Sequence, residues 1–117
     1  MHKYSPEFRL KKRKEFLRVQ ADGRKCASKN FLLSYSKSQD KSRLVVTVTR
    51  KVDKRAVARN RIKRIVREFF RRRRSYFQQD VDMVFIALNG ASELENYEIR
   101  KQLNYLCKKT KLLAPRK

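Results

Sequence analysis

Apolar and polar residues alternate with a helical period between Asp53 and Arg74. The apolar positions fall at i, i+4, i+7, i+8 and i+11, a spacing that gathers them into one stripe: Ala58, Ile62, Ile65, Val66 and Phe69. At about 100° per residue, the opposite arc carries polar and cationic residues: Arg59, Asn60, Lys63, Arg64, Arg67 and Arg71. The pattern predicts a helix that starts near Asp53 as N-cap, with one side in a core and a cationic side opposite.

Shorter periods on either side of this helix predict strands. Residues 25–36 favour one strand, with Phe31 and Leu33 on one face and Leu32 and Ser34 on the other. The β-branched run 43–49 favours a second strand, and the short polar link predicts that the two pair antiparallel. Residues 81–88 favour a further strand.

Two more helices complete the pattern. Residues 11–22 favour a short amphipathic helix ended by Gly23. Asn96 is expected to cap a last helix, whose core-spaced residues are Ile99, Leu103, Leu106 and Cys107. Three or four strands with three helices predict a small α+β two-layer sandwich.

The net charge of the chain indicates that this predicted fold belongs to a binding protein. The 117 residues have a formal net charge of +22, far more than solubility requires, which indicates a polyanionic partner. Nucleic acid is favoured over a membrane surface, because the basic helix lacks Trp and its apolar stripe is no wider than a core requires. With no secretory signal and no apolar run long enough to span a bilayer, we expect a single domain in the cytoplasm with reduced cysteines.

Candidate catalytic residues are scarce. The one histidine, His2, stands at a terminus, and with two distant cysteines it cannot build a zinc site. Two glycines exclude a phosphate-cradling loop. Asp80 and Asp82 have the spacing of paired magnesium ligands, although solvated strand ends are the favoured interpretation. We therefore expect no catalytic residues and no metal site on this chain.

The segment Arg59-Asn60-Arg61 is the sharpest local feature. A planar amide between two guanidiniums can contact phosphates, 2′-hydroxyls and base edges together. Phe16 is open to two interpretations, as a core residue or as part of a groove on which unstacked bases rest.

At these residues the chain resembles the protein subunit of bacterial ribonuclease P. The segment AVARNRIKRIVREFFR (56–71) is similar to that family's signature. The resemblance continues through 9–24, 30–35, 43–51, 81–87 and 95–106, which covers nearly the whole chain in order.

The resemblance implies a fold and a role. The fold would be α-β-β-β-α-β-α, like the second domain of a small-subunit ribosomal protein, with a left-handed β-α-β crossover. Independently of the resemblance, we expect flexible ends at 1–8 and 112–117. The role would be that of an accessory subunit in the removal of the 5′ leader from precursor tRNA. The active site and its Mg²⁺ would belong to a catalytic RNA, and no small-molecule cofactor or membrane would be involved.

Site residues follow from the same resemblance, position by position. Those implied to bind the catalytic RNA are Lys51, Lys54, Arg55, Arg59, Asn60, Arg61, Lys63, Arg64 and Arg67. Those implied to line the cleft for the leader of precursor tRNA are Phe16, Leu32, Ser34, Val46 and Val48.

The chain departs from the family pattern at four positions. Gln20 and Ser34 replace residues that are often aromatic, and Leu88 replaces a common Arg, so we expect a leader contact that is more electrostatic. Asp53 places a carboxylate in a region that is usually basic or neutral.

From the residues alone, three other readings stay open: a ribosomal or other structural RNA-binding protein, a nuclease using Asp80 and Asp82, and a major-groove DNA reader.

Overall fold

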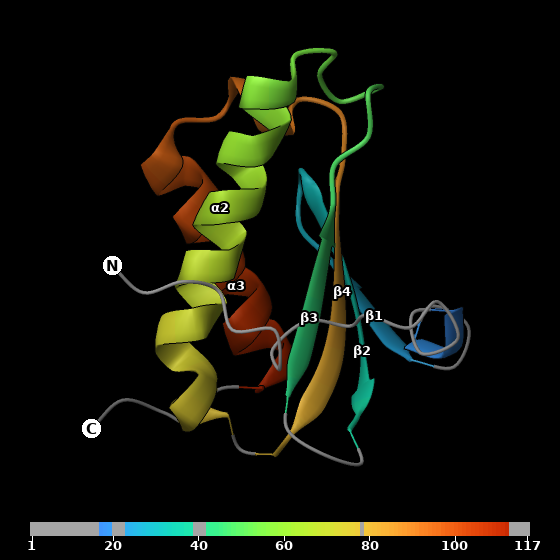
Figure 1. The fold of residues 1–117 in the computed structure, drawn as a ribbon. Helices are drawn as coiled ribbons and strands as arrows, with labels where there is room; N and C mark the ends of the chain where they lie inside the picture. Colours follow the sequence, from blue (N-terminus) through green and yellow to red (C-terminus); the bar gives the residue numbers. More distant parts are fainter. Residues whose placement is uncertain (1–16, 20–22, 39–41, 78, 113–117) are drawn as a thin grey trace.

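The computed structural model describes residues 17–19, 23–38, 42–77 and 79–112. After a helical segment at 17–19, the elements are β1 (Arg24–Ala27), β2 (Phe31–Lys37), β3 (Arg43–Thr47), α2 (Ala56–Arg73), η2 (Arg74–Tyr76), β4 (Val81–Ala87), η3 (Ala91–Glu93) and α3 (Asn96–Thr110). Helices α2 and α3 lie side by side against one face of the sheet (Figure 1). The α+β two-layer architecture predicted from the sequence is confirmed.

The four strands are ordered β1-β2-β4-β3. Strand β2 is antiparallel to both β1 and β4, whereas β3 is parallel to β4. Two details of the prediction are wrong. Residues 25–36 form two strands, and 43–49 do not pair with them, because β4 lies between β2 and β3. Six of the seven β4 residues are buried, as suits a strand with a neighbour on each side and cover on both faces.

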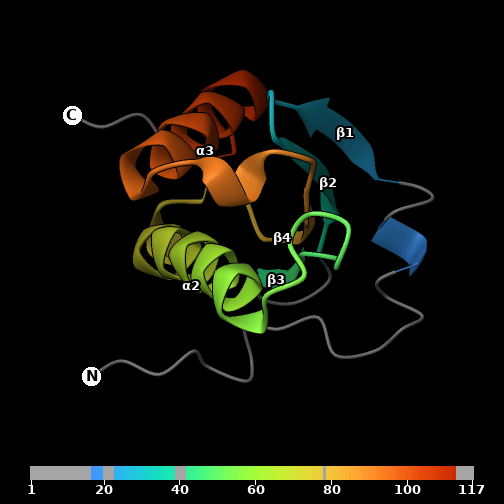
Figure 2. The ribbon, with the colours of Figure 1, turned by 90° about the horizontal axis from the view of Figure 1, so that it is seen from above.

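The connection from β3 to β4 carries the basic helix. Followed through α2 in Figures 1 and 2, this β-α-β crossover is left-handed, whereas nearly all such connections in proteins are right-handed. The crossover places α2 at the edge of the helical layer, beside α3, with its charged side turned away from the sheet.

The main core lies between the helices and one face of the sheet, here called the core face. Helix α2 contributes Ile62, Ile65, Val66, Phe69 and Phe70. The strands contribute Phe31, Leu33, Leu44, Val46, Met83 and Phe85. Ala58, expected in the buried stripe, is only half-buried. The expected core residues of α3, Ile99, Leu103, Leu106 and Cys107, are all buried.

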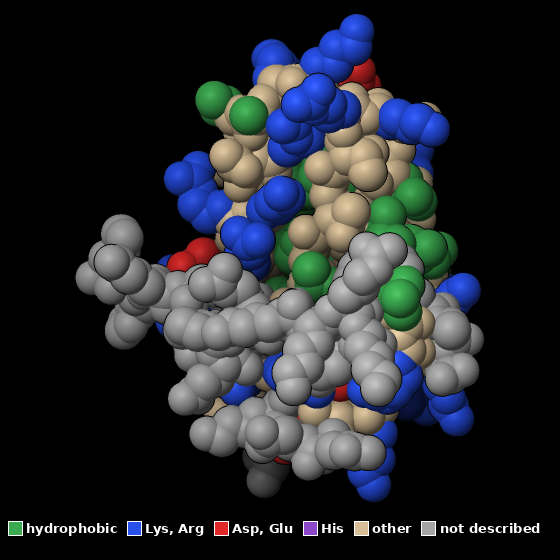
Figure 3. All heavy atoms as spheres, turned by 45° about the vertical axis from the view of Figure 1, so that its right-hand side comes forward, with side chains coloured by type: hydrophobic (Ala, Val, Ile, Leu, Met, Phe, Trp, Pro, Cys, Tyr) green, Lys and Arg blue, Asp and Glu red, His purple; other side chains and the backbone are tan. Residues whose placement is uncertain are grey.

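The opposite face of the sheet, here called the outer face, carries the strand residues of the other parity. Three rows cross it: Leu32–Ile86–Thr47, Ser34–Val84–Val45 and Ser36–Asp82–Arg43. Val19 of the N-terminal segment packs on Val84 in a small second cluster, with Val45 and Ile86 beside it. This face comes forward in Figure 3, where apolar side chains have Lys and Arg around them.

Gly23 is required by the close approach of the N-terminal segment to β2. Its N–H donates to the Val19 carbonyl at 2.9 Å. A Cβ at this position would lie 2.3 Å from that carbonyl oxygen and 2.8 Å from the Tyr35 carbonyl oxygen, so any other residue would push the segment away from the sheet.

Three predicted element ends need correction. The N-cap of α2 is Arg55 rather than Asp53, which lies two residues earlier. The N-cap of α3 is Glu95, which forms a capping box with Glu98, and Asn96 is the first helical residue. Leu112 was expected in a flexible tail, but it is 4% exposed and packs in the core, while 1–8 and 113–117 lie outside the described residues.

Candidate nucleic-acid interface

The outward side of α2 and the loop before it carry a group of polar side chains that are available for binding. We call this group the α2 surface: Lys51, Lys54, Asn60, Lys63 and Arg64. All are exposed except Lys63, which is half-buried. None of the five side chains has a hydrogen-bond or ion-pair partner in the part of the chain that the structure describes. Four positive charges on this surface therefore have no counter-charge from the described ranges, which favours an anionic ligand.

Several of the arginines implied to bind RNA are engaged with the chain itself, among them Arg59, Arg61 and Arg55. Arg59 is half-buried and donates to the carbonyls of Asp53 (3.0 Å) and Lys54 (2.8 Å). It therefore ties the first turn of α2 to the preceding loop. Arg59 lies one turn before Lys63 on the same side of α2, but its guanidinium is engaged by the carbonyls of that loop.

Arg61 forms another internal contact, between α2 and the start of α3. Its guanidinium donates to Asn96 Oδ1 (2.6 Å), to the Ser92 carbonyl (3.1 Å) and to the Leu94 carbonyl (3.0 Å). The carbonyl partners come from η3 and the link to α3, which leave backbone acceptors without partners of their own. Arg61 thus fixes the orientation of α3 relative to α2 in addition to any role at RNA.

Asp53 organises the loop that leads into α2. Its Oδ1 accepts the Arg55 backbone N–H at 2.8 Å, and its Oδ2 forms an ion pair with the Arg55 guanidinium at 2.9 Å. These contacts with Arg55 hold the pKa of the Asp53 carboxyl well below its usual range. Asp53 therefore cancels the charge of Arg55 and leaves the α2 surface positive.

Charges near the end of α2 are also partly satisfied. Glu68 accepts from Arg71 at 2.7 Å and lies 3.7 Å from Arg72. The Arg73 guanidinium stacks over the Phe69 ring at 3.7 Å and donates to the Phe69 carbonyl. The uncompensated charge of α2 is therefore concentrated in the first half of the helix and the loop before it.

The residues implied to line the leader cleft divide between the two faces of the sheet. Leu32 and Ser34 lie on the outer face, where Leu32 is half-buried and Ser34 is 1% exposed. Val46 and Val48 are buried in the main core, so their assignment to a cleft is wrong. On β3, Val45 occupies the outer-face position instead. Phe16 and Gln20 lie outside the described residues.

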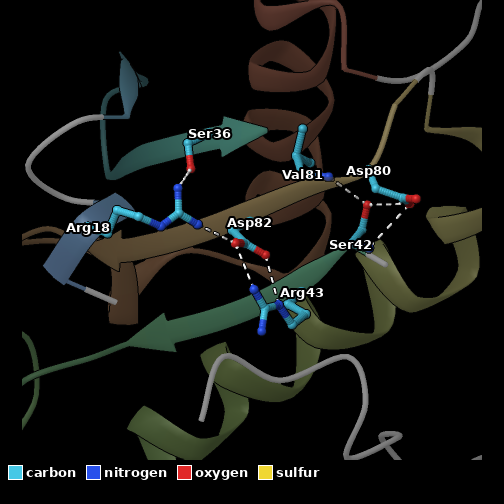
Figure 4. A network of polar contacts seen from close by, with 7 residues as sticks. All are labelled: Arg18, Ser36, Ser42, Arg43, Asp80, Val81 and Asp82. Carbon is cyan, nitrogen blue, oxygen red and sulfur yellow. Dashed lines mark hydrogen bonds and ion pairs between the residues drawn. The ribbon is translucent and has the colours of Figure 1, made fainter. Parts of the chain in front are cut away.

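A buried carboxylate stands at one end of the outer face. Asp82 is fully buried, and its two oxygens accept from Arg43 (2.9 and 3.0 Å) and from Arg18 (2.7 Å), which also donates to Ser36 (Figure 4). Arg18 comes from the N-terminal segment, so this network fastens the segment to β3 and β4. This network was not predicted from the sequence, although an isolated Asp inside an apolar strand of a basic chain is a signal for a buried ion pair.

Asp80 and Asp82 do not form the metal pair considered from their spacing. Asp80 Oδ1 accepts from the Ser42 N–H and hydroxyl at 3.2 Å each, and the Ser42 hydroxyl accepts the Val81 N–H. Figure 4 shows these two carboxylates engaged in separate contacts. No group of three potential metal ligands occurs among the residues that the structure describes. The described helices are also too short or too polar to cross a bilayer.

Comparisons with known proteins agree with this arrangement. The model of the family Ribonuclease P matches residues 5–111. The ribonuclease P protein component of Shouchella clausii is 40% identical over 111 residues, covering 93% of this chain and 90% of that protein. The RNase P protein of Staphylococcus aureus superposes with a TM-score of 0.84 at 30% identity, covering 91% of this chain and 97% of that chain. The RNase P protein of Thermotoga maritima gives a TM-score of 0.75 at 33% identity, covering 86% and 96%.

Proposed function

This chain belongs to the ribonuclease P protein family, as an accessory subunit of that endoribonuclease in tRNA processing, and we propose how its surfaces divide the work. The α2 surface binds the catalytic RNA. The outer face of the sheet holds the 5′ leader of precursor tRNA, the substrate from which the holoenzyme removes that leader.

One observation carries the first half of this proposal. The α2 surface presents Lys51, Lys54, Lys63 and Arg64 without an internal counter-charge in the described structure, on a rigid helix and at its N-terminal loop. Cations that contact phosphates release condensed counterions, which supplies affinity without sequence reading. Asn60 lies among them and adds an amide that can hydrogen-bond to a 2′-hydroxyl or a base edge.

The outer face supports the second half. Leu32, Val45 and Ile86 are half-buried there, so apolar surface remains available for unstacked bases. Arg18 and Arg43 stand at one end, where each guanidinium retains exposed surface beside Asp82. A single strand lying along these rows would meet apolar side chains first and then positive charge.

In this proposal the RNA supplies the reacting groups and binds most of the Mg²⁺. The protein subunit lowers the repulsion between the phosphates of the two RNAs and so raises substrate affinity. Because Mg²⁺ screens the same repulsion, the contribution of the protein should be largest where Mg²⁺ is scarce. The proposed location is the cytoplasm, together with precursor tRNA.

Reconstitution tests the proposed function as a whole. The purified chain is added to the catalytic RNA of ribonuclease P, and cleavage of precursor tRNA is measured over a range of Mg²⁺ concentrations. We expect the protein to increase kcat/KM most strongly at the lowest Mg²⁺ that supports cleavage. Equal cleavage with and without protein across the range would refute the proposal.

The α2 surface is tested separately with matched arginine variants. Arg64→Gln removes an uncompensated charge, whereas Arg72→Gln removes a charge near Glu68 on the same helix. Plotting log K for the catalytic RNA against log salt, we expect the slope for Arg64→Gln to decrease by about 0.7–0.9, with a smaller change for Arg72→Gln. Equal slopes for wild type and Arg64→Gln would place Arg64 away from the RNA.

Arg61→Ala provides an informative contrast. Because three hydrogen bonds hold Arg61 against η3 and α3, its loss should lower the free energy of unfolding by about 1–3 kcal/mol. Urea denaturation measures this. Unchanged stability, together with a reduced salt slope, would instead assign Arg61 mainly to RNA contact.

A further inference from the structure

The outward side of α3 carries a second group of exposed side chains, which the proposed function does not use. Tyr97, Lys101, Asn104 and Lys108 follow one another at i, i+4, i+7 and i+11, so they share one side of the helix. Together with the flanking Arg100 and Tyr105 they line a shallow open hollow, and we call these six residues the α3 strip. All six are exposed, Tyr97 by 67% and Tyr105 by 47%.

The aromatic rings of the α3 strip do not belong to the core. The inner side of α3 is already filled by Ile99, Leu103 and Leu106, which are fully buried. Tyr97 and Tyr105 therefore keep much of their ring surface in water, at a cost in free energy that a stacking partner would remove.

The cations of the α3 strip have no partner in the described part of the chain. Arg100, Lys101 and Lys108 make no hydrogen bond or ion pair within the described residues. The nearest acidic residues in sequence, Glu95 and Glu98, are engaged in the capping box at the start of the helix. Just beyond the strip, Lys109 lies 5.6 Å from the Tyr105 ring centre and donates to its hydroxyl. The strip is thus uniformly positive around two rings.

This combination fits single-stranded RNA better than a folded protein or a duplex. Exposed tyrosines offer stacking surfaces to unpaired bases of any identity, and flanking Lys and Arg follow the phosphates. A duplex hides its base faces and would leave both rings unused. An apolar protein partner would have to desolvate three unpaired cations.

The α3 strip is also held in a fixed orientation to the α2 surface. Arg61 of α2 donates to Asn96, the first residue of α3, and to carbonyls of the preceding link. Both helices lie in the same layer, with their outward sides away from the sheet (Figure 2). An RNA seated on the α2 surface can therefore meet the α3 strip without any rearrangement of the protein.

We propose that the α3 strip is a second RNA-contacting surface, which stacks unpaired bases of the catalytic RNA on Tyr97 and Tyr105 and contacts their phosphates through Arg100, Lys101 and Lys108. This inference rests on the proposed function of the α2 surface. It assigns the strip to the catalytic RNA rather than to the leader, because the leader-binding outer face lies on the other side of the sheet.

The stacking is tested with a double variant and its conservative counterpart. Tyr97→Ala with Tyr105→Ala removes both rings from exposed positions, and Tyr97→Phe with Tyr105→Phe retains them. We expect the alanine pair to weaken binding of the catalytic RNA, without substrate, by about fivefold or more, and the phenylalanine pair to bind within about twofold of wild type. A urea melt that matches wild type excludes misfolding as the cause.

The phosphate contacts are tested by removing charge. Lys101→Gln with Lys108→Gln should reduce the salt slope for the catalytic RNA by about 1.4–1.8, the value for two lost contacts. Lys29→Gln with Lys37→Gln, a matched pair of exposed lysines in the turn before β2 and at the end of β2, should leave it nearly unchanged. An equal effect of the two pairs would show that only total charge matters and would overturn the proposal.

The remaining outcomes separate this inference from the proposed function. If Arg64→Gln reduces the slope while the alanine pair leaves catalytic-RNA affinity unchanged, the α3 strip is not an RNA surface and the α2 surface stands. If the alanine pair instead weakens only the binding of precursor tRNA to saturated holoenzyme, the assignment to the catalytic RNA is wrong. If neither helix affects binding, the proposed function itself fails.

Discussion

The two faces of the sheet are built from the same strands but carry different kinds of side chain. The core face is buried and apolar, with Phe85 packed against Phe70 at 4.8 Å between ring centres. The outer face mixes half-buried apolar residues with a buried carboxylate held by two arginines. Because side chains alternate along a strand, neighbouring residues fill the core on one face and, in the proposed function, contact the leader on the other.

The largest expected effect is a difference in the free energy of unfolding between variants of two neighbouring residues on β4. Phe85→Ala opens a cavity in the main core and should lower the free energy of unfolding by about 3–5 kcal/mol. Ile86→Ala acts on the outer face, where the side chain is only half-buried, and should cost about 1 kcal/mol. Urea denaturation of both variants measures the difference. Equal losses would mean that the outer face is packed as tightly as the core.

A smaller loss is expected from the polar end of the outer face. Asp82→Ala leaves Arg18 and Arg43 without their shared acceptor and should lower the free energy of unfolding by about 1–3 kcal/mol, because both arginines retain access to water. Glu93→Ala, an exposed carboxylate, is the control. Greater protease sensitivity near the N-terminus should accompany the loss in Asp82→Ala. A variant as stable as wild type would show that the network is energetically neutral.

Substitutions in β3 test the assignment of Val45 and Val46. Val45→Ser should weaken the binding of precursor tRNA by several-fold, while mature tRNA without a leader binds as before. Val46→Ser should instead reduce stability, because a hydroxyl would be buried in the main core. The opposite pattern, with leader binding lost only in Val46→Ser, would reverse the two faces of β3.

The smallest expected effect is on the reactivity of the Cys107 thiol, which is buried in the main core. Burial raises the pKa of the Cys107 thiol to about 12, so the reactive thiolate should be scarce below that pH. Cys107 should therefore react with iodoacetamide at pH 8 far more slowly in the folded than in the urea-unfolded chain. Because the folded pKa is raised, the associated stability is complete below about pH 9 and is lost as pH rises towards 12. Equal labelling rates in the two states would place Cys107 at an open surface.

Arg61 and Arg64 show how much of the candidate site could be read from sequence. Both lie in the same cationic segment, and the resemblance implied that both bind RNA. The structure places Arg64 in water and Arg61 against three acceptors that come from residues 92–96. Helical periodicity is a local property and cannot identify acceptors that arrive from thirty residues further along the chain.

The strands show the same limit. The alternation within each strand correctly separated Phe31 and Leu33 from Leu32 and Ser34. The predicted antiparallel pairing of β3 with the preceding strand was wrong. A short link favours such a hairpin, whereas β3 pairs in parallel with β4, which follows the whole of α2. The assignment of Val46 to the cleft was wrong, because Val45, one residue earlier, occupies the outer face. A shift of one residue along a strand moves the side chain to the opposite face.

The sequence by itself determined the helical stripe of α2, the apolar character of β4, the excess of positive charge and the membership of the family, because each depends on residue order and composition alone. Tertiary structure decided which charges remain uncompensated. Arg18, Arg43, Arg59 and Arg61 find acceptors that folding brings within reach. Lys63, Arg64 and the cations of the α3 strip find none among the residues that the structure describes. A charge stays uncompensated where the described part of the folded chain brings no acceptor within reach, and the order of residues alone does not show where that happens.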